Sequence, residues 1–220
     1  MNPRTERTTL AGPAGILELA IDRPAGAPVG VAVLCHPHPL HGGTLDNKVV
    51  QTLARAAVQL GRVALRFNFR GVGASAGRWD EGRGEVDDVL AVVAACRDPA
   101  HPLGLSAGAA DPGAAAGDLT LGGFSFGAAM AARAAARLAE QGAPAARLLL
   151  IGPAVANFPA PAVSQPTVVI HGEADDVVPL AAVLDWARPQ ALPVTVIPGA
   201  GHFFHGQITL LKQLVVGALR

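Results

Sequence analysis

The chain has 220 residues, of which 50% are hydrophobic, and this size and composition predict one globular domain over residues 1–220. Its formal net charge is zero and it has no basic cluster, so the composition argues against a nucleic-acid-binding protein. It has no apolar run of about 18 residues, which argues against a membrane protein, and residues 1–7 lack the apolar core of an export signal, which favours the cytoplasm.

Strand and helix patterns alternate along the chain. Apolar runs predict an early strand near a sheet edge and then a series of buried strands, at 16–21, 29–35, 62–69, 119–121, 147–151, 167–170 and 194–197. Helices are predicted at about 46–60, 84–97, 127–141, 179–188 and 204–218, and Gly61 and Gly142 are expected to end two of them as left-handed caps. This alternation predicts a mostly parallel central sheet with helices on both faces. Such sheets place their sites beyond the carboxyl ends of the strands.

Two connections and two cysteines complete the fold prediction. The Ala-, Gly- and Pro-rich tract 99–117 is expected to be a surface loop. Only about 15 residues separate the strands predicted at 147–151 and 167–170, which is an ordinary loop length and too short for a lid domain. Cys35 and Cys96 fall inside a predicted strand and a predicted helix, so we expect buried thiols rather than a disulfide. A site at the carboxyl edge of the sheet is therefore expected to be open to solvent.

Three of the four serines lie in a Gly-x-Ser-x-Gly pentapeptide, namely Ser75, Ser106 and Ser125. In a chain with 26 glycines the pentapeptide alone is weak evidence, so its surroundings decide. Ser75 and Ser106 lie in loop-like sequence. Ser125 follows an apolar run at 119–121 and precedes a long alanine-rich helix, a pattern that predicts a strand, a tight turn and a helix.

A serine at such a turn is held in a cramped backbone conformation, and its flanking glycines let the strand and the helix approach without Cβ clashes. It also lies at the N-terminus of a helix, where free N–H groups favour a developing anion. We therefore predict that Ser125 is a nucleophile.

A serine hydroxyl needs a base to activate it, and the base needs an acid to orient it. His202 follows a predicted strand through a Gly-rich loop, which can carry its imidazole over the site, whereas His205 is expected on the following helix. Carboxylates follow another strand at Glu173, Asp175 and Asp176. From the residues alone any of the three can be the acid, and one of the other two is expected to cap the next helix. The order nucleophile, acid, base is the one expected for a nucleophile elbow in a parallel α/β sheet.

With these motifs the chain resembles the α/β-hydrolase superfamily over nearly its full length. Segments 171–179 and 196–204 look like the acid loop and the histidine loop of that superfamily, in which the acid lies four positions before a proline, and this selects Asp175. Residues 68–75 look like its structural turn after the fourth strand, which gives Ser75 a non-catalytic role. Residues 35–48, which begin Cys-His-Pro-His-Pro-Leu-His-Gly-Gly, resemble a branch of small, lidless hydrolases of largely unassigned substrate. The resemblance implies a single-domain α/β-hydrolase fold without a lid domain.

The segment 36–43 follows a buried strand at the place where this fold supplies its second oxyanion donor, the first being the backbone N–H of Phe126. The two prolines of the segment have no N–H, so His38 and Leu40 are the backbone donors to consider. By analogy with related His-Gly loops His38 has the expected offset, and the greater length of this loop leaves Leu40 open as well.

The same segment also allows a metal-site interpretation. His36-x-His38 after a strand, with His41 and Asp46 nearby, matches the way in which a metal-dependent amidohydrolase begins. That enzyme class needs a (β/α)₈ barrel of about 250 residues with further ligands on later strands, and this shorter chain offers His171 and Asp175 but little else. We therefore expect no metal and no cofactor, and we expect His36 and His41 to hold the loop in place by hydrogen bonds.

The leading functional prediction is a serine hydrolase that acts on a small ester or thioester, with Ser125, Asp175 and His202 as its catalytic triad. Its partner is then a small-molecule acyl substrate, and the oligomeric state stays open. Aromatic residues from loops or a helix start are expected to line the substrate groove: Trp79, Phe158 and Phe203. The alternatives are a peptidase or an acyltransferase with the same triad, or a non-catalytic ligand-binding domain on this fold.

Overall fold

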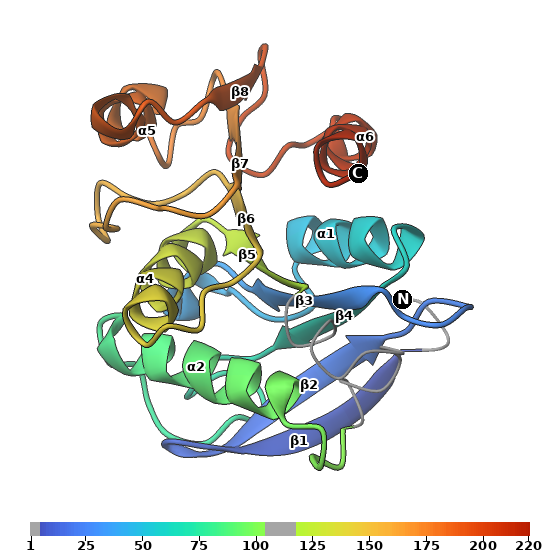
Figure 1. The fold of residues 1–220 in the computed structure, drawn as a ribbon. Helices are drawn as coiled ribbons and strands as arrows, with labels where there is room; N and C mark the ends of the chain where they lie inside the picture. The colour runs from blue at the N-terminus through green and yellow to red at the C-terminus, as the bar shows by residue number, and fades with distance from the viewer. Residues whose placement is uncertain (1–4, 104–117) are drawn as a thin grey trace.

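The computed structural model describes residues 5–103 and 118–220, which form one central sheet flanked by helices (Figure 1). The strands are β1 Glu6–Gly12, β2 Gly15–Asp22, β3 Gly30–Cys35, β4 Arg62–Phe67, β5 Leu119–Phe124, β6 Arg147–Ile151, β7 Thr167–Gly172 and β8 Val194–Ile197. Within the described residues their order in the sheet is β1-β2-β4-β3-β5-β6-β7-β8. β1 pairs antiparallel with β2, and β2 with β4, while all pairs from β4 to β8 are parallel. The predicted mostly parallel sheet is confirmed.

Helices cover both faces of this sheet, as predicted. They are α1 Lys48–Gln59, α2 Arg83–Arg97, α4 Phe126–Glu140, α5 Leu180–Ala187 and α6 Ile208–Ala218, with short 3₁₀ turns at Pro39–His41 and Arg188–Gln190. Figure 1 shows α1 and α6 on one face and α2, α4 and α5 on the other. Each face has its own apolar core: Leu53, Phe124 and Leu211 belong to the first, and Phe126 and Met130 to the second. The burial of this apolar surface is the main favourable term in folding.

The N-terminal edge of the sheet differs from the prediction. The strand predicted at 16–21 lies within β2, but the edge strand outside it, β1, was not predicted. Among the described strands β1 pairs only with β2, and most of its side chains are exposed or half-buried. An edge strand needs no continuous apolar run because only part of it faces the core, which explains the weak signal of Glu6-Arg7-Thr8-Thr9.

The last helix begins later than predicted. Phe204 has a φ of 52° and Gly206 a φ of 75°, values that belong to the left-handed region and cannot continue a right-handed helix. α6 therefore starts at Ile208, and the prediction that His205 lies on the helix is wrong. The predicted caps Gly61 and Gly142 are confirmed, with φ angles of 78° and 72°.

The connections agree with an uncovered carboxyl edge. Residues 152–166, between β6 and β7, contain neither helix nor strand. Of the predicted loop 99–117, only residues 99–103 belong to the described residues, so Ser106 lies outside them. Cys35 and Cys96 are buried free thiols, as expected. Among the described helices, none has the length and apolar character needed to cross a membrane.

A buried histidine joins the segments that follow β3 and β4. His36 is fully buried; its Nδ1–H donates to Pro37 O at 2.6 Å, and its Nε2 accepts the backbone N–H of Phe69 at 3.0 Å. Burial lowers the pKa of His36 to about 4 and outweighs the Pro37 hydrogen bond, so the imidazole is neutral. The Phe69 amide thus leaves the sheet to bind a side chain, which explains why β4 ends at Phe67 and not at residue 69 as predicted.

Ser75 closes the turn after β4. Its hydroxyl donates to Asn68 O at 2.7 Å and accepts the backbone N–H of Glu18 at 2.9 Å. The side chain of Asn68 extends the same network, since it donates to Glu18 Oε2 at 2.7 Å and accepts the N–H of Leu45 at 2.8 Å. Ser75 is 7% exposed, so its role here is structural, as the resemblance implied.

We predict that Ser75→Ala destabilises the fold by about 1–3 kcal/mol, because it leaves the Glu18 amide and the Asn68 carbonyl without a buried partner. Urea unfolding measures this loss. Ser164→Ala is the matched control, because Ser164 is exposed and its truncation is expected to change stability by less than about 0.5 kcal/mol. Equal effects of the two substitutions would contradict the structural role of Ser75.

We also predict a pH-dependent loss of stability from His36. Its folded pKa of about 4 lies below the ordinary value of 6.5, so the unfolded chain binds more protons between these pH values and stability falls as the pH falls. The difference corresponds to about 3 kcal/mol of unfolding free energy, present above pH 6.5 and lost by pH 4. Unfolding at several pH values measures the slope. The slope should be smaller in His36→Gln, and an unchanged slope would contradict this assignment.

Candidate active site

The turn between β5 and α4 holds Ser125 in a strained conformation. Ser125 has φ 57° and ψ −119°, a combination that L-residues rarely adopt. Its N–H donates to Ile151 O at 2.9 Å, which ties the turn to the neighbouring strand. A Cβ at Gly123 would lie 2.8 Å from Cys35 O, and one at Gly127 would lie 2.4 Å from the same oxygen. Both glycines are therefore needed for the close packing of β5 and α4 against the end of β3.

The structure brings Ser125, His202 and Asp175 together in one line of hydrogen bonds. His202 Nε2 lies 2.9 Å from Ser125 Oγ, and His202 Nδ1 lies 2.7 Å from Asp175 Oδ2. All three residues are buried, with exposed fractions of 7%, 3% and 8%. The side chains come from loops that follow β5, β8 and β7, and the carboxyl ends of these strands meet at one edge of the sheet.

The acid loop supplies further donors to Asp175. Asp175 Oδ1 accepts the backbone N–H groups of Val177 and Val178 at 3.0 and 2.7 Å. Burial alone would raise the pKa of Asp175, but the hydrogen bonds from His202 and from the two amides outweigh it and hold the pKa below its ordinary value. The carboxylate is thus ionised beside His202.

The two other carboxylates of this loop do not reach the imidazole. Glu173 Oε2 accepts the N–H of Gly199 at 2.9 Å and ties the acid loop to the histidine loop, while Asp176 is exposed. Neither caps the next helix, since the N-cap of α5 is Pro179 and it has no side-chain cap. The cap expected from the sequence is therefore absent at α5.

His171 lies beneath this loop at the end of β7. It is fully buried, with Nε2 2.9 Å from Val178 O and 3.4 Å from Asp175 Oδ2. Burial lowers the pKa of His171, so its imidazole is neutral. Sequence reasoning considered this residue only as a metal ligand. Its position four residues before the acid, on a strand and not in a loop, was the available signal for a role in supporting Asp175.

The two predicted loop amides after β3 differ in their hydrogen-bond partners. The N–H of Leu40 donates to Nδ1 of His38 at 3.2 Å, and Leu40 is 68% exposed. The backbone N–H groups of His38 and Phe126 have no acceptor among the residues that the structure describes. The segment is anchored at its far end, where Leu45 accepts a hydrogen bond from buried Arg66 at 2.7 Å.

The residues of the metal-site interpretation are engaged elsewhere. Both ring nitrogens of His36 have protein partners, and Asp46 pairs with Arg7 at 2.7 Å. His41 packs its ring 4.5 Å from that of His38, and its side chain makes no hydrogen bond to the described residues, contrary to the prediction. Across residues 5–103 and 118–220, no group of three or more His, Cys, Asp or Glu side chains is placed to hold a metal ion.

The aromatic residues predicted to line the groove fall into two groups. Trp79 and Phe158 are half-buried and pack against His38, with ring centroids 4.6 and 5.5 Å away. Both also contact Phe126, so one aromatic cluster lies beside the turn of the nucleophile. Phe203 lies apart from this cluster; it is 46% exposed and packs 5.1 Å from His202.

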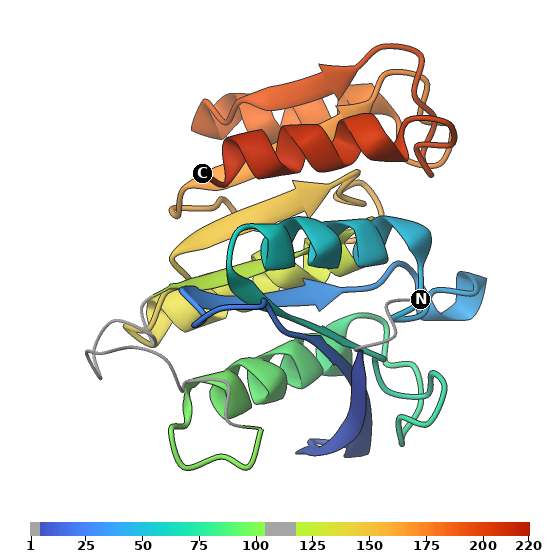
Figure 2. The same ribbon diagram turned by 90° about the vertical axis from the view of Figure 1, so that its right-hand side faces the viewer.

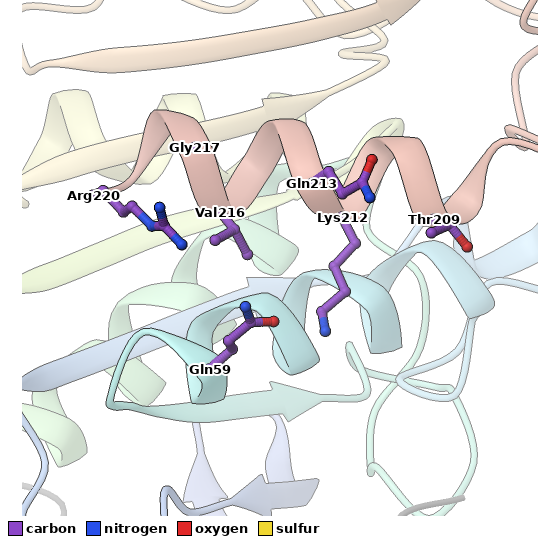
Figure 3. Close-up of a pocket in the computed structure, with 7 residues that line it drawn as sticks. All are labelled: Gln59, Thr209, Lys212, Gln213, Val216, Gly217 and Arg220. Atoms are coloured by element: carbon purple, nitrogen blue, oxygen red, sulfur yellow. The ribbon is translucent and has the colours of Figure 1, made fainter.

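A groove between α1 and α6 lies apart from this chemistry. It measures about 410 Å³ and is lined mostly by polar side chains (Figure 3): Gln59, Thr209, Lys212, Gln213, Val216, Gly217 and Arg220. None of these residues belongs to the line of hydrogen bonds through His202. A smaller hollow of about 210 Å³ adjoins the histidine loop, lined by Asn47, Lys48, Val49, Phe203, His205 and Ile208.

The chain was first compared with family models and with curated proteins. No family model matches the chain. Among curated proteins, an uncharacterized protein of Rickettsia prowazekii is 42% identical over 82 residues, which are 37% of this chain. The match spans 34% of that relative, about a third of its length.

Solved structures match over the full length. The chain is 35% identical to an α/β serine hydrolase without a lid from Xanthomonas campestris, with a TM-score of 0.83 and coverage of 100% of this chain and 95% of the other. It is 39% identical to an α/β serine hydrolase homologue from Coxiella burnetii, with a TM-score of 0.82 and coverage of 98% and 97%. The chain therefore belongs to the α/β-hydrolase superfamily, with lidless serine hydrolases as its structural relatives.

Proposed function

We propose that this hydrolase cleaves a small ester or thioester through an acyl-enzyme, with Ser125 as nucleophile, His202 as base and Asp175 as the orienting acid. The observation that carries the proposal is the pair of hydrogen bonds through one imidazole, 2.9 Å to the serine hydroxyl and 2.7 Å to the carboxylate. A hydroxyl, an imidazole and an ionised carboxylate in this order are the parts that nucleophilic acyl transfer needs.

In the first half of the reaction, Ser125 Oγ attacks the acyl carbon while His202 Nε2 takes the hydroxyl proton. Asp175 holds the Nδ1–H of the imidazole and stabilises the imidazolium that forms. The tetrahedral intermediate collapses as His202 returns the proton to the leaving oxygen or sulfur, which leaves an ester between Ser125 and the acyl group. Water then attacks this ester with His202 again as base, and the carboxylic acid and free serine are formed.

The oxyanion of the intermediate is proposed to bind the backbone N–H groups of Phe126 and His38. Both amides lack an acceptor among the described residues, whereas the Leu40 amide already has one. The Phe126 amide is also the first of α4, where the helix end favours negative charge. One such donor stabilises a transition state by about 3 kcal/mol, and a turn that is stiffened by Pro37 and Pro39 loses little freedom when it binds.

Ser125→Ala tests the proposal. We expect kcat/KM for an activated short-chain ester such as 4-nitrophenyl acetate to fall by a factor on the order of 10⁴ to 10⁶, and labelling by a fluorophosphonate to disappear. The same assays on Ser75→Ala provide the control, because Ser75 lies in the same pentapeptide pattern but away from His202. Turnover or labelling that survives in folded Ser125→Ala would refute the assignment.

A further inference from the structure

The hollow beside the histidine loop is placed to receive part of a substrate. Figure 2 shows α1 and α6 starting at the edge of the sheet to which the arrowheads of β6 and β8 point, and residues from both helix starts line the hollow. Phe203 connects the hollow to the hydrogen-bonded triad, since its ring lies 5.1 Å from that of His202 and 6.0 Å from that of Phe124. We call this the Lys48 hollow.

The chemistry of acyl transfer assigns this side to the leaving group. His202 Nε2 must return its proton to the leaving atom, so the leaving group lies against the imidazole, while the acyl oxygen faces the amides of Phe126 and His38. Phe203 follows His202 directly and flanks its ring. A leaving group that extends from the imidazole along Phe203 would enter the Lys48 hollow, because Phe203 is one of the residues that line it.

The charge in the hollow is positive and unopposed. No carboxylate lines it, and Lys48 has no ion pair with any described residue. The nearest acid in sequence, Asp46, is paired with Arg7 at 2.7 Å and Arg66 at 3.4 Å. The start of α1 is capped, because the side chain of Asn47 accepts the backbone N–H groups of Val49 and Val50 at 2.9 and 3.4 Å.

We propose that the leaving group of the natural substrate carries an anionic group, which pairs with Lys48 while its apolar part packs on Phe203. This inference rests on the proposed function, since it uses His202 as the proton donor to the leaving group. It narrows the substrate class to esters or thioesters of an alcohol, phenol or thiol that also bears a carboxylate or a phosphate.

Two acetate esters that differ by one charge test the proposal. Phenyl acetate and 4-carboxyphenyl acetate share the acyl group, and comparing the ratio of their kcat/KM values between variants cancels their intrinsic difference in reactivity. We expect Lys48→Met to lower the preference for the carboxylate ester about two- to fivefold, as for an exposed ion pair, and Lys48→Glu to lower it further. High salt should reduce the preference of the wild-type protein, because salt screens exposed charges.

The chain contains a matched control, since Lys48 and Lys212 are its only lysines and Lys212 lines the α1–α6 groove (Figure 3). Lys212→Met removes the same charge and should leave the ratio unchanged. An unchanged ratio in Lys48→Met, or an equal change in both variants, would overturn the proposal. Wild-type protein that hydrolyses neither ester would contradict the proposed function itself and this inference with it.

A separate observation concerns the buried imidazole of His171. Val178 O can only accept, so His171 Nε2 carries the proton of the 2.9 Å hydrogen bond, and the same N–H lies 3.4 Å from Asp175 Oδ2. That oxygen also binds His202 Nδ1 at 2.7 Å. His171 Nδ1 is buried without a partner among the described residues, a cost that an apolar side chain would avoid.

We infer that His171 is a positioning residue, which fixes the acid loop through Val178 and shares with His202 the carboxylate oxygen of Asp175. Removing its N–H should let the loop shift. It should also leave Asp175 Oδ2 with a single imidazole donor. The expected sign is a lower rate, because the acid and the base are then less well placed.

His171→Leu and His171→Gln separate this role from simple packing, since the glutamine amide retains an N–H donor and leucine does not. We expect His171→Leu to lower kcat/KM about ten- to a hundredfold, the cost of a misplaced catalytic group. His171→Gln should recover most of this loss, at comparable stability in urea unfolding. Unchanged kcat/KM in His171→Leu, or equal behaviour of the two variants, would overturn the inference.

Discussion

The contact between the turn at Ser125 and the end of β3 is the constraint on which the rest of the site depends. Gly127 lies so close to the carbonyl groups of Cys35 and His36 that a Cβ there would come within 2.4 Å of both oxygens. This approach sets the start of α4 beside the segment after β3, where the rings of His38 and Phe126 lie 5.3 Å apart. The positive φ of Ser125 is a local cost of order 1–3 kcal/mol, and the surrounding hydrogen bonds offset it.

Two neutral histidines and one fully hydrogen-bonded carboxylate support this arrangement. His36 and His171 are buried, burial lowers their pKa values, and each donates a ring N–H to a backbone carbonyl. Asp175 receives N–H donors on both oxygens. A buried carboxylate with this many donors stays ionised and keeps one orientation, and groups that are already oriented need little reorganisation when charge develops in a reaction.

Much of this architecture could be predicted because it follows from local signals. Glycines flanking Ser125 between an apolar run and an alanine-rich helix predict a tight turn, and parallel strands bring their following loops to one edge. These signals indicated Ser125 and His202, while the selection of Asp175 came from the resemblance to the superfamily. The catalytic roles of these residues remain proposals. The edge strand β1 was missed because Glu6-Arg7-Thr8-Thr9 has no apolar run, and its strand form comes from pairing with β2.

The remaining differences depend on single contacts that composition does not encode. The Leu40 amide is taken by the ring of His38, and the choice between two loop donors depended on that one bond. The left-handed Phe204, with its side chain fully buried, delays the start of α6 and keeps His205 off the helix. The support that His171 gives to Asp175 depends on the path of the loop between them, which the sequence spacing alone does not determine.

The plain connection at 152–166 has a consequence for selectivity. A hydrolase with a mobile cover can reject a poor substrate by failing to close, and it can retain a good one until the reaction is complete. Among the described residues, a short irregular segment stands between β6 and β7 in place of such a cover, so this segment offers no closing step that could select a substrate. Discrimination between substrates then has to come from fixed contacts at the rim, such as the ring of Phe203 and the charge of Lys48, and their reach limits how selective the protein can be.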